Sequence, residues 1–479
     1  MISTFFGLEI ARRGLMATRS AMDVTAHNLA NASTEGYTRQ EPVFSATDPY
    51  TLPNIFQRLL PGQLGTGTEV SRIRRVRDEF LDSQVRAAES EDGFWQARQD
   101  ALQKVEALFP EPSEDTGLGA ALARFFDAWH ELNNDPGDPG LKAAVKEAGE
   151  ELAVQFRHLY QQLEGIRSSH EDDIILKAKR INEIAEELAG LNKAISLVVA
   201  NGNQPNDLLD RRDVLLDELA GIISVDVDIQ DNGTVAVAIS NSTVSVSLVN
   251  QNGDFNHIDL DDGRDDLFDA TTGKLTLKIV DSLGGSVGNL DITDDAAGYK
   301  MPGTLAGAES ARWGIASKDG VGNLSGGYLY QLNELANAII TRLNALHGTQ
   351  RFFSGSGAAD IDLDSNIKSD VNTVNGDAAL NIAQLREDNT VMPGGTFEAY
   401  YRGLVSGIGA DTDGSGHQAD TARAVLDQLK SLRQSVAGVS LDEELTRLTQ
   451  FQYAYQASAR VVTVLDSMLD TIINRMGVT

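Results

Sequence analysis

Heptad repeats at both ends of the chain limit its possible folds more than any other feature. Near the C-terminus, apolar or aromatic residues recur every seven positions, and a second row follows three residues later. The first row is Leu441, Leu448, Tyr455, Val462, Leu469 and Met476, and the second is Phe451, Ser458, Leu465 and Ile472, preceded by the off-pattern Glu444. Such a repeat over five heptads is typical of a coiled-coil seam.

The N-terminus carries a matching pattern. Its rows are Leu8, Leu15, Met22 and Leu29, and, at the second spacing, Ala11, Thr18, Thr25 and Ala32. Small residues in the second row let a partner helix approach closely, so we expect the two ends to pair as coiled-coil helices. Two unrelated amphipathic helices on a globular core remain the alternative.

Composition excludes several classes of function. The formal net charge of −30, without clustered Lys or Arg, argues against nucleic-acid binding. The absence of cysteine removes disulfides, thiolate catalysis and cysteine-ligated metals. No apolar run reaches eighteen residues, so no membrane insertion is expected. Glu9, Arg12 and Arg13 interrupt the first apolar stretch, which therefore does not resemble a cleavable signal.

The interior changes character along the chain. Residues 40–70 are expected to be extended and irregular, and helical spacing runs from 72 to 109. Residues 141–199 predict one very long helix, whose heptads slip in phase near Gly165, where we expect a kink or a change of packing partner. Alternating residues at 225–239 flank an Asp-Asn-Gly-Thr turn and predict a β-hairpin. Gly- and Asp-rich connections follow to about 322, and a glycine loop is expected at 407–416.

The predicted fold class is therefore multidomain α+β. It combines paired N- and C-terminal coiled-coil helices, a long-helix bundle and an inserted antiparallel β domain. We expect three domains: residues 1–40 with 440–479, residues 41–224 with 324–439, and residues 225–323 as the outer β-rich insert.

Motifs for catalysis or metal binding are weak. Residues 284–288 match G-x-S-x-G, but a helix does not follow, so a turn is expected. Asp360, Asp362 and Asp364 imitate the start of a calcium loop that lacks its Gly and its final Glu. The histidines are scattered, and His27 is interpreted as a polar flank of the seam. We expect no catalytic, metal or cofactor site.

Both ends resemble the flagellar rod, hook and hook-associated proteins. The N-terminal resemblance lies in residues 28–40, although Glu35 stands where the family usually has Pro. Its motif residues are Asn28, Asn31, Thr34, Gly36 and Tyr37. Residues 451–459 resemble the C-terminal signature. The long helix, residues 205–213 and the turn at 231–234 narrow the resemblance to the FlgK family of hook-associated proteins at the hook–filament junction.

The resemblance implies a secreted structural protein of the extracellular flagellum, exported by the type III apparatus and assembled as a ring through its ends. Implied partners are further copies of itself, the hook protein below, a second junction protein above, and an export chaperone at the C-terminal helix. Three alternatives stay open: a hook or distal rod protein, an axial-ended peptidoglycan hydrolase using Asp261 and Asp262, and an adhesin using the β insert.

Overall fold

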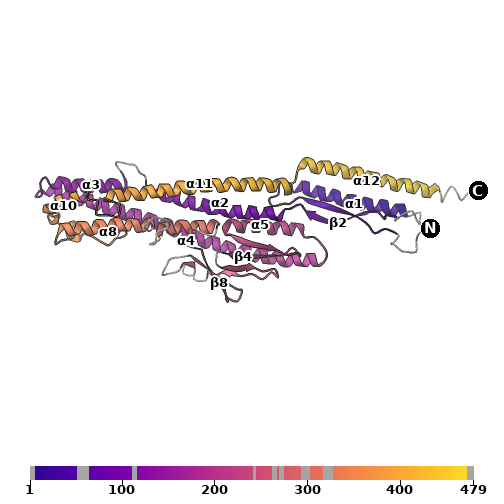
Figure 1. Ribbon diagram of the computed structural model, residues 1–479, viewed down its shortest axis with the longest axis horizontal. Coiled ribbons are helices and arrows are strands. Elements are labelled where there is room, and N and C mark those ends of the chain that lie inside the picture. Colours follow the sequence, from indigo (N-terminus) through magenta and orange to yellow (C-terminus); the bar gives the residue numbers. More distant parts are fainter. Residues whose placement is uncertain are drawn as a thin grey trace, which may run out of the picture.

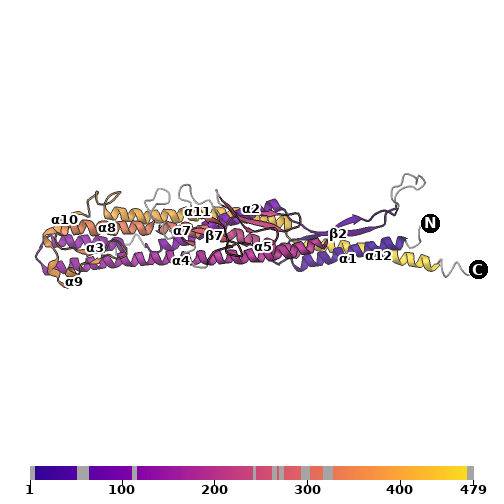
Figure 2. The same cartoon turned by 90° about the horizontal axis from the view of Figure 1, so that it is seen from below.

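The computed structural model describes residues 6–50, 64–109, 116–240, 244–260, 267–268, 275–292, 302–316 and 327–471. The chain forms a long rod, with both termini at one end (Figure 1). Helices run along the rod, and small antiparallel sheets lie on its side, as the rotated view also shows (Figure 2). The predicted α+β fold class is confirmed.

Helices from the two ends of the chain lie side by side at that end of the rod. Helix α1 (Phe6–Ala30) packs against α12 (Leu441–Asp470), and a hairpin of β1 (Gln40–Ala46) and β2 (Thr68–Arg75) packs on α1. The helix expected from residue 72 begins later, because 68–75 pair with β1. Asp78 then accepts hydrogen bonds from the backbone of Phe80 and Leu81 and starts the helix.

Two antiparallel helices, α2 (Glu79–Glu106) and α11 (Phe397–Ala437), form one side of the rod. The expected glycine loop at 407–416 is wrong, since α11 runs through it. Leu404, Ile408 and Ser415 are buried at helical spacing, and a Cβ on Gly416 would lie 3.0 Å from Gln99 Nε2 of α2. Packing against α2 thus outweighs the cost of glycine in a helix, roughly 0.5–1 kcal/mol per residue.

The long helix is confirmed as α4 (Pro139–Ala200), which Asp138 caps by accepting from the backbone of Gly140 and Leu141. The helix is unbroken at Gly165, but its packing partners change there. Residues up to Leu163 belong to one buried cluster and residues from Ile174 to another. The heptad slip therefore marks the change of partner. Helix α5 (Asn206–Ile222) turns back along α4.

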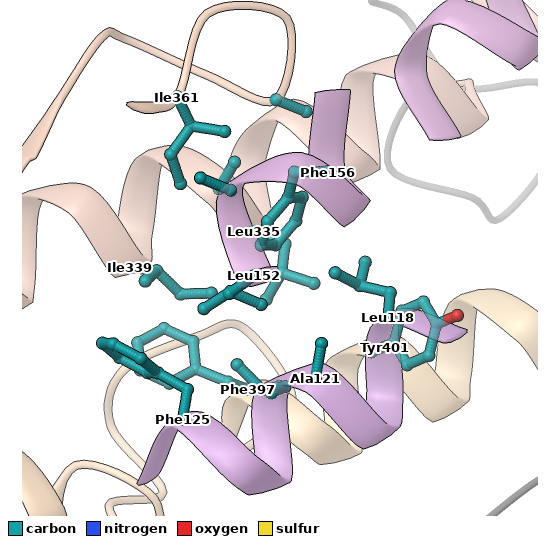
Figure 3. Packing of buried hydrophobic residues seen from close by; sticks show 14 of the residues in the cluster. Leu118, Ala121, Phe125, Leu152, Phe156, Leu335, Ile339, Ile361, Phe397 and Tyr401 are labelled. Carbon is teal, nitrogen blue, oxygen red and sulfur yellow. The ribbon is translucent and has the colours of Figure 1, made fainter. Parts of the chain in front are cut away.

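The first cluster fills the end of the rod far from the termini. Helix α3 (Gly117–Leu132), α4 and α8 (Tyr328–His347) enclose aromatic residues, among them Phe125 and Phe156, while Phe397 and Tyr401 come from α11 (Figure 3). The short elements of residues 353–384 cover this end. They are β9 (Phe353–Ser354), β10 (Asp362–Leu363), α9 (Ser365–Ser369), η1 (Val371–Thr373), η2 (Gly376–Ala378) and α10 (Ala379–Gln384).

Two three-stranded sheets contribute residues to the second buried cluster, together with α4 from Ile174 onward. The predicted hairpin is confirmed as β3 (Val225–Ile229) and β4 (Val235–Ser240), with Val227 opposite Val237. The sheets have the orders β3-β4-β5 and β6-β7-β8. The remaining strands are β5 (Ser245–Val249), β6 (His257–Ile258), β7 (Thr276–Val280) and β8 (Ser286–Asp291).

Residues 225–323, expected to form a β-rich insert, also include a helix. Residues Thr304–Ala316 form α7, which packs against α2 and α4. A Cβ on Gly307 would lie 2.2 Å from the Phe94 carbonyl oxygen, so glycine here permits close helix packing rather than a loop. Buried Glu309 and Arg312 pair at 2.7 Å within α7.

Candidate functional site

The terminal helices pair in an antiparallel register defined by three contacts. A Cβ on Gly7 would lie 3.3 Å from the Leu465 side chain, and one on Gly14 would lie 3.3 Å from Ser458 Oγ. Further along, Asn28 Nδ2 donates to Glu444 Oε2 at 2.9 Å. These contacts are seven and fourteen residues apart on both helices, so small residues of α1 face the second predicted row of α12.

The predicted first row of α1 lies beside this contact line. Leu8, Leu15, Met22 and Leu29 are half-buried, whereas Ala11 and Thr25 of the second row are buried. On α12, the half-buried predicted seam residues are Leu448, Phe451, Ser458, Val462, Leu465 and Leu469. Leu441 and Tyr455 are exposed, and Ile472 and Met476 lie outside the described residues.

A second apolar row on α12 faces solvent. We call it the outer stripe; it consists of Tyr453, Val461, Val464 and Met468, which share one side of the helix. Sequence reasoning did not predict this row, because it considered only the residues that fit the heptads. The spacing of three and four between Val461, Val464 and Met468 could have revealed it. Helix α12 thus has one face on α1 and a neighbouring apolar face uncovered by the described residues.

Asn28 joins α1, β1 and α12 through one side-chain amide. Besides Glu444, Nδ2 donates to the Gln40 carbonyl oxygen at 2.8 Å. Asn28 Oδ1 accepts from Tyr37 Oη at 2.8 Å and from the Gln40 backbone N–H at 2.9 Å. Burial raises the pKa of Tyr37, and the nearby carboxylates Asp210, Asp207 and Glu444 raise it further. The phenol therefore stays protonated as a donor.

The other residues of the N-terminal motif build the turn after α1. The Thr34 backbone N–H donates to the Asn31 carbonyl oxygen at 2.9 Å, and its hydroxyl donates to Asn31 Oδ1. Gly36 has φ +76°, and a Cβ there would lie 2.1 Å from Val214 Cγ2 of α5. Only glycine fits this left-handed position so close to α5. The turn is therefore a contact between the terminal pair and the body of the rod.

Ion pairs connect β1 to the start of α12. Arg39 Nη1 lies 3.0 Å from Glu443 Oε2, and Arg447 Nη1 lies 3.0 Å from Glu41 Oε1. The Arg39 backbone N–H also donates to the Ala437 carbonyl oxygen, at the end of α11. Arg39, directly before β1, thus contacts both helices on either side of Gly438.

Beneath the turn lies a buried ionic cluster that we call the joint. It consists of Arg75, Arg77, Arg86, Arg212 and Arg433 with Asp82, Asp210, Asp213 and Asp217. Residues 205–213, singled out in the sequence, supply three of these side chains from α5, while β2, α2 and α11 supply others. The joint therefore ties α5 to the segments that lead into the terminal pair.

Asp213 is the centre of the joint. Its carboxylate lies 2.7 Å from Arg75 Nη1, 2.9 Å from Arg77 Nη1 and 2.6 Å from Arg212 Nη2. Burial alone would raise the pKa of Asp213, but Arg77, Arg212 and Arg75 together lower it to about 2. Asp210 reaches the terminal segment directly, since its Oδ2 accepts from the Thr38 backbone N–H at 3.1 Å.

Comparison with known proteins identifies the family. The model of the flagellar hook-associated protein FlgK helical domain matches residues 102–361, more than half of the chain. The chain belongs to the FlgK family. Models of the flagellar basal body rod FlgEFG protein C-terminal segment and of the flagella basal body rod protein match residues 433–476 and 8–38. These two matches cover α12 and most of α1, the pair described above.

The sequences of related proteins align with all or nearly all of this chain. Flagellar hook-associated protein 1 of Bacillus subtilis is 30% identical and covers 100% of this chain and 99% of its own length. Its namesake in Salmonella typhimurium is 26% identical, covering 97% of this chain and 98% of its own. The structure of the flagellar hook junction protein FlgK from Burkholderia pseudomallei has a similar fold, with a TM-score of 0.59 at 14% identity. It covers 74% of this chain and 100% of its own.

Family membership confirms that this FlgK-family chain is a structural protein of the flagellum and not an enzyme. The G-x-S-x-G match covers the end of the turn between β7 and β8 and the first three residues of β8. In this turn Asp281 accepts from the backbone of Leu283 and Gly285. Asp261 and Asp262 lie outside the described residues.

The calcium-like carboxylates have protein partners. Asp360 accepts from the backbone of Ser356 and Gly357, Asp362 pairs with Lys368 at 2.6 Å, and Asp364 caps α9. Among the described residues there is no cluster of side chains that could hold a metal ion. His27 lies 3.7 Å from Asp207 beside the pair. No described helix has the length and apolar character needed to span a membrane.

Proposed function

We propose that this FlgK-family chain forms the ring-like junction between the flagellar hook and the filament by self-assembly of its terminal helices. The outer stripe carries this proposal. It exposes four apolar side chains on one side of α12, the helix that matches the rod-protein C-terminal model. Apolar faces of this extent on one helix are typical of surfaces that a neighbouring chain covers.

The joint gives such an assembly a defined geometry. Ion pairs and the turn at Gly36 fix the terminal pair against the body, so that contacts made by α12 orient the whole rod. Because each copy would offer the outer stripe to a different surface of the next copy, the contact is heterologous and closes into a ring only at a suitable rotation.

The further partners belong to this proposal. The hook protein would lie below the ring and a second junction protein above it, outside the cell. An export chaperone would cover α12 before assembly, since an uncovered outer stripe favours aggregation. The name of the curated relatives favours the junction over a hook or distal rod position.

We also propose the three-domain division, with one change. The terminal domain keeps residues 1–40 and 440–479, and the outer domain begins at 225. Helix α7 packs on α2 and α4, which favours its assignment to the middle domain. An adhesive role for the outer domain has no observation in its favour.

Substitution of the outer stripe tests self-assembly. The variant combines Val461→Asp with Val464→Asp, and the matched control, Thr463→Asp, changes an exposed residue on the side of α12 away from both α1 and the stripe. Both are produced in a flagellated host that lacks its own copy, and isolated hooks are assayed for the bound chain. We expect the control to be retained and the stripe variant to be lost, with equal circular dichroism spectra. Retention of the stripe variant on hooks would overturn the proposal.

A further inference from the structure

Glu444 is the one charged residue on the line of α12 that faces α1. Its side chain is 1% exposed, as is that of Asn28 opposite. The other positions on this line are Phe451, Ser458 and Leu465. Burying a carboxylate in a helix contact costs stability unless hydrogen bonds compensate it. Its presence here therefore calls for a role other than stabilising the pair.

Hydrogen bonds other than the one to Glu444 fix the orientation of the Asn28 amide. Its Oδ1 accepts from Tyr37 Oη and from the Gln40 backbone N–H, and one Nδ2 hydrogen is donated to the Gln40 carbonyl oxygen. The remaining Nδ2 hydrogen points at Glu444 Oε2. Within the described residues Glu444 Oε1 has no hydrogen-bond partner, and Arg447 Nη1 lies 3.6 Å away. Asn28 therefore offers Glu444 a single hydrogen-bond donor of fixed orientation.

The apolar part of the contact does not distinguish one register from another. Gly7, Gly14 and Ala21 present nearly the same small surface to α12 at every heptad. A slip of α12 by one heptad would keep apolar residues facing α1. It would also place Phe451 opposite Asn28 and leave the Asn28 donor unpaired. A lost partner for a buried polar group costs about 1–3 kcal/mol.

We propose that Asn28 and Glu444 are positioning residues that set the register of α12 on α1. We call this pair the polar layer. Asn28 supplies an oriented hydrogen-bond donor, and Glu444 supplies the acceptor that lies opposite it on the α12 line. A buried polar pair in a coiled coil is known to select register at some cost in stability. This property belongs to the single chain and goes beyond ring assembly, so it can be measured on the monomer.

Engineered disulfides can report the register, because the chain has no cysteine. Gly14→Cys with Ser458→Cys reports the native register, since a Cβ on Gly14 would lie 4.0 Å from Ser458 Cβ, within the range of disulfides. Gly14→Cys with Leu465→Cys reports a slip of one heptad. In the native register these two positions are offset by about 10 Å along the helices and cannot join.

Three variants of the polar layer are compared in both reporter backgrounds. Glu444→Gln keeps an acceptor for Asn28 and serves as the conservative control. Glu444→Leu removes the acceptor. Glu444→Leu with Phe451→Glu moves the carboxylate by one heptad. The measured quantity is the ratio of native to slipped crosslinking rates in the full-length monomer under mild oxidation.

The native chain and Glu444→Gln should give the same high ratio. Glu444→Leu should lower it at least tenfold, and the chain with the moved carboxylate should form the slipped crosslink faster than the native one. An unchanged ratio in Glu444→Leu would overturn the proposal. Loss of both crosslinks in that variant would also overturn it, because the layer would then stabilise the pair without selecting its register.

Discussion

Replacing Asp213 by Asn should weaken the attachment of the terminal pair to the body more than any other single charge removal in the joint. The carboxylate is 3% exposed and contacts Arg75, Arg77 and Arg212 within 3 Å. Asn keeps the shape of the side chain but removes the charge. The joint would then hold five arginines against three carboxylates, in a site that solvent does not screen.

The size of the effect follows from two independent estimates. The pKa of Asp213 falls from 3.8 to about 2 on folding, which corresponds to roughly 2.5 kcal/mol at neutral pH. Removing one partner of a buried ion pair generally costs about 3–5 kcal/mol. The second figure is larger because it includes the arginine donors left unpaired. We therefore expect Asp213→Asn to lower the free energy of unfolding by about 3 kcal/mol.

Urea denaturation of the native chain and the variant measures this loss, and Asp207→Asn is the control. Asp207 lies on the same helix, but its side chain is 75% exposed. Since folding lowers the pKa of Asp213, its contribution is complete above about pH 5 and is lost as pH falls through 3.8 toward 2. The difference between native chain and Asp213→Asn should thus shrink to roughly half at pH 3. A loss below 1 kcal/mol at pH 7, or a difference that grows on acidification, would refute the reasoning.

Three further predictions follow from described contacts. Gly36→Ala should lower the melting temperature by several degrees, because a Cβ at φ +76° would meet Val214, whereas Gly165→Ala, which meets nothing within 4 Å, should not lower it. Burial lowers the pKa of His170 to about 4, so stability should fall by about 2 kcal/mol between pH 7 and pH 5, and calorimetry should find this fall missing in His170→Gln. In the monomer, hydrogen–deuterium exchange should be faster in α12 than in the 174–195 part of α4, and equal protection would contradict the open outer stripe.

The long helices and the hairpin could be predicted because their signals are local. The heptads within residues 141–199 indicate α4, and the alternation around Val227 and Val237 defines the hairpin. Helices α7 and the middle of α11 could not, since glycine at 307 and 416 looks like a loop signal until a neighbouring helix is known. Tertiary packing outweighs local propensity at these positions.

The terminal pairing was visible in the heptads, but the facing row on α1 was displaced by one residue. A pattern search selects the largest apolar side chains, here Leu8 and Leu15, whereas close helix contact uses the smallest, Gly7 and Gly14. The joint was not predictable, because its charges come from segments far apart in the chain. Arg75 and Asp213, for example, are separated by 138 residues.

Asn28 and Glu444 are separated by 416 residues, and this separation determines when their contact can form during synthesis and folding. A chain that emerges from the ribosome at about 5–20 residues per second presents α1 roughly 20–80 s before its partner exists. Closing so long a loop in an unfolded chain costs roughly 5 kcal/mol. Once the rod has folded, however, Thr38 is bound to Asp210 and Arg39 to Ala437, and only short segments remain to close. The body thus acts as a template, and the first and last helices meet only after everything between them has folded.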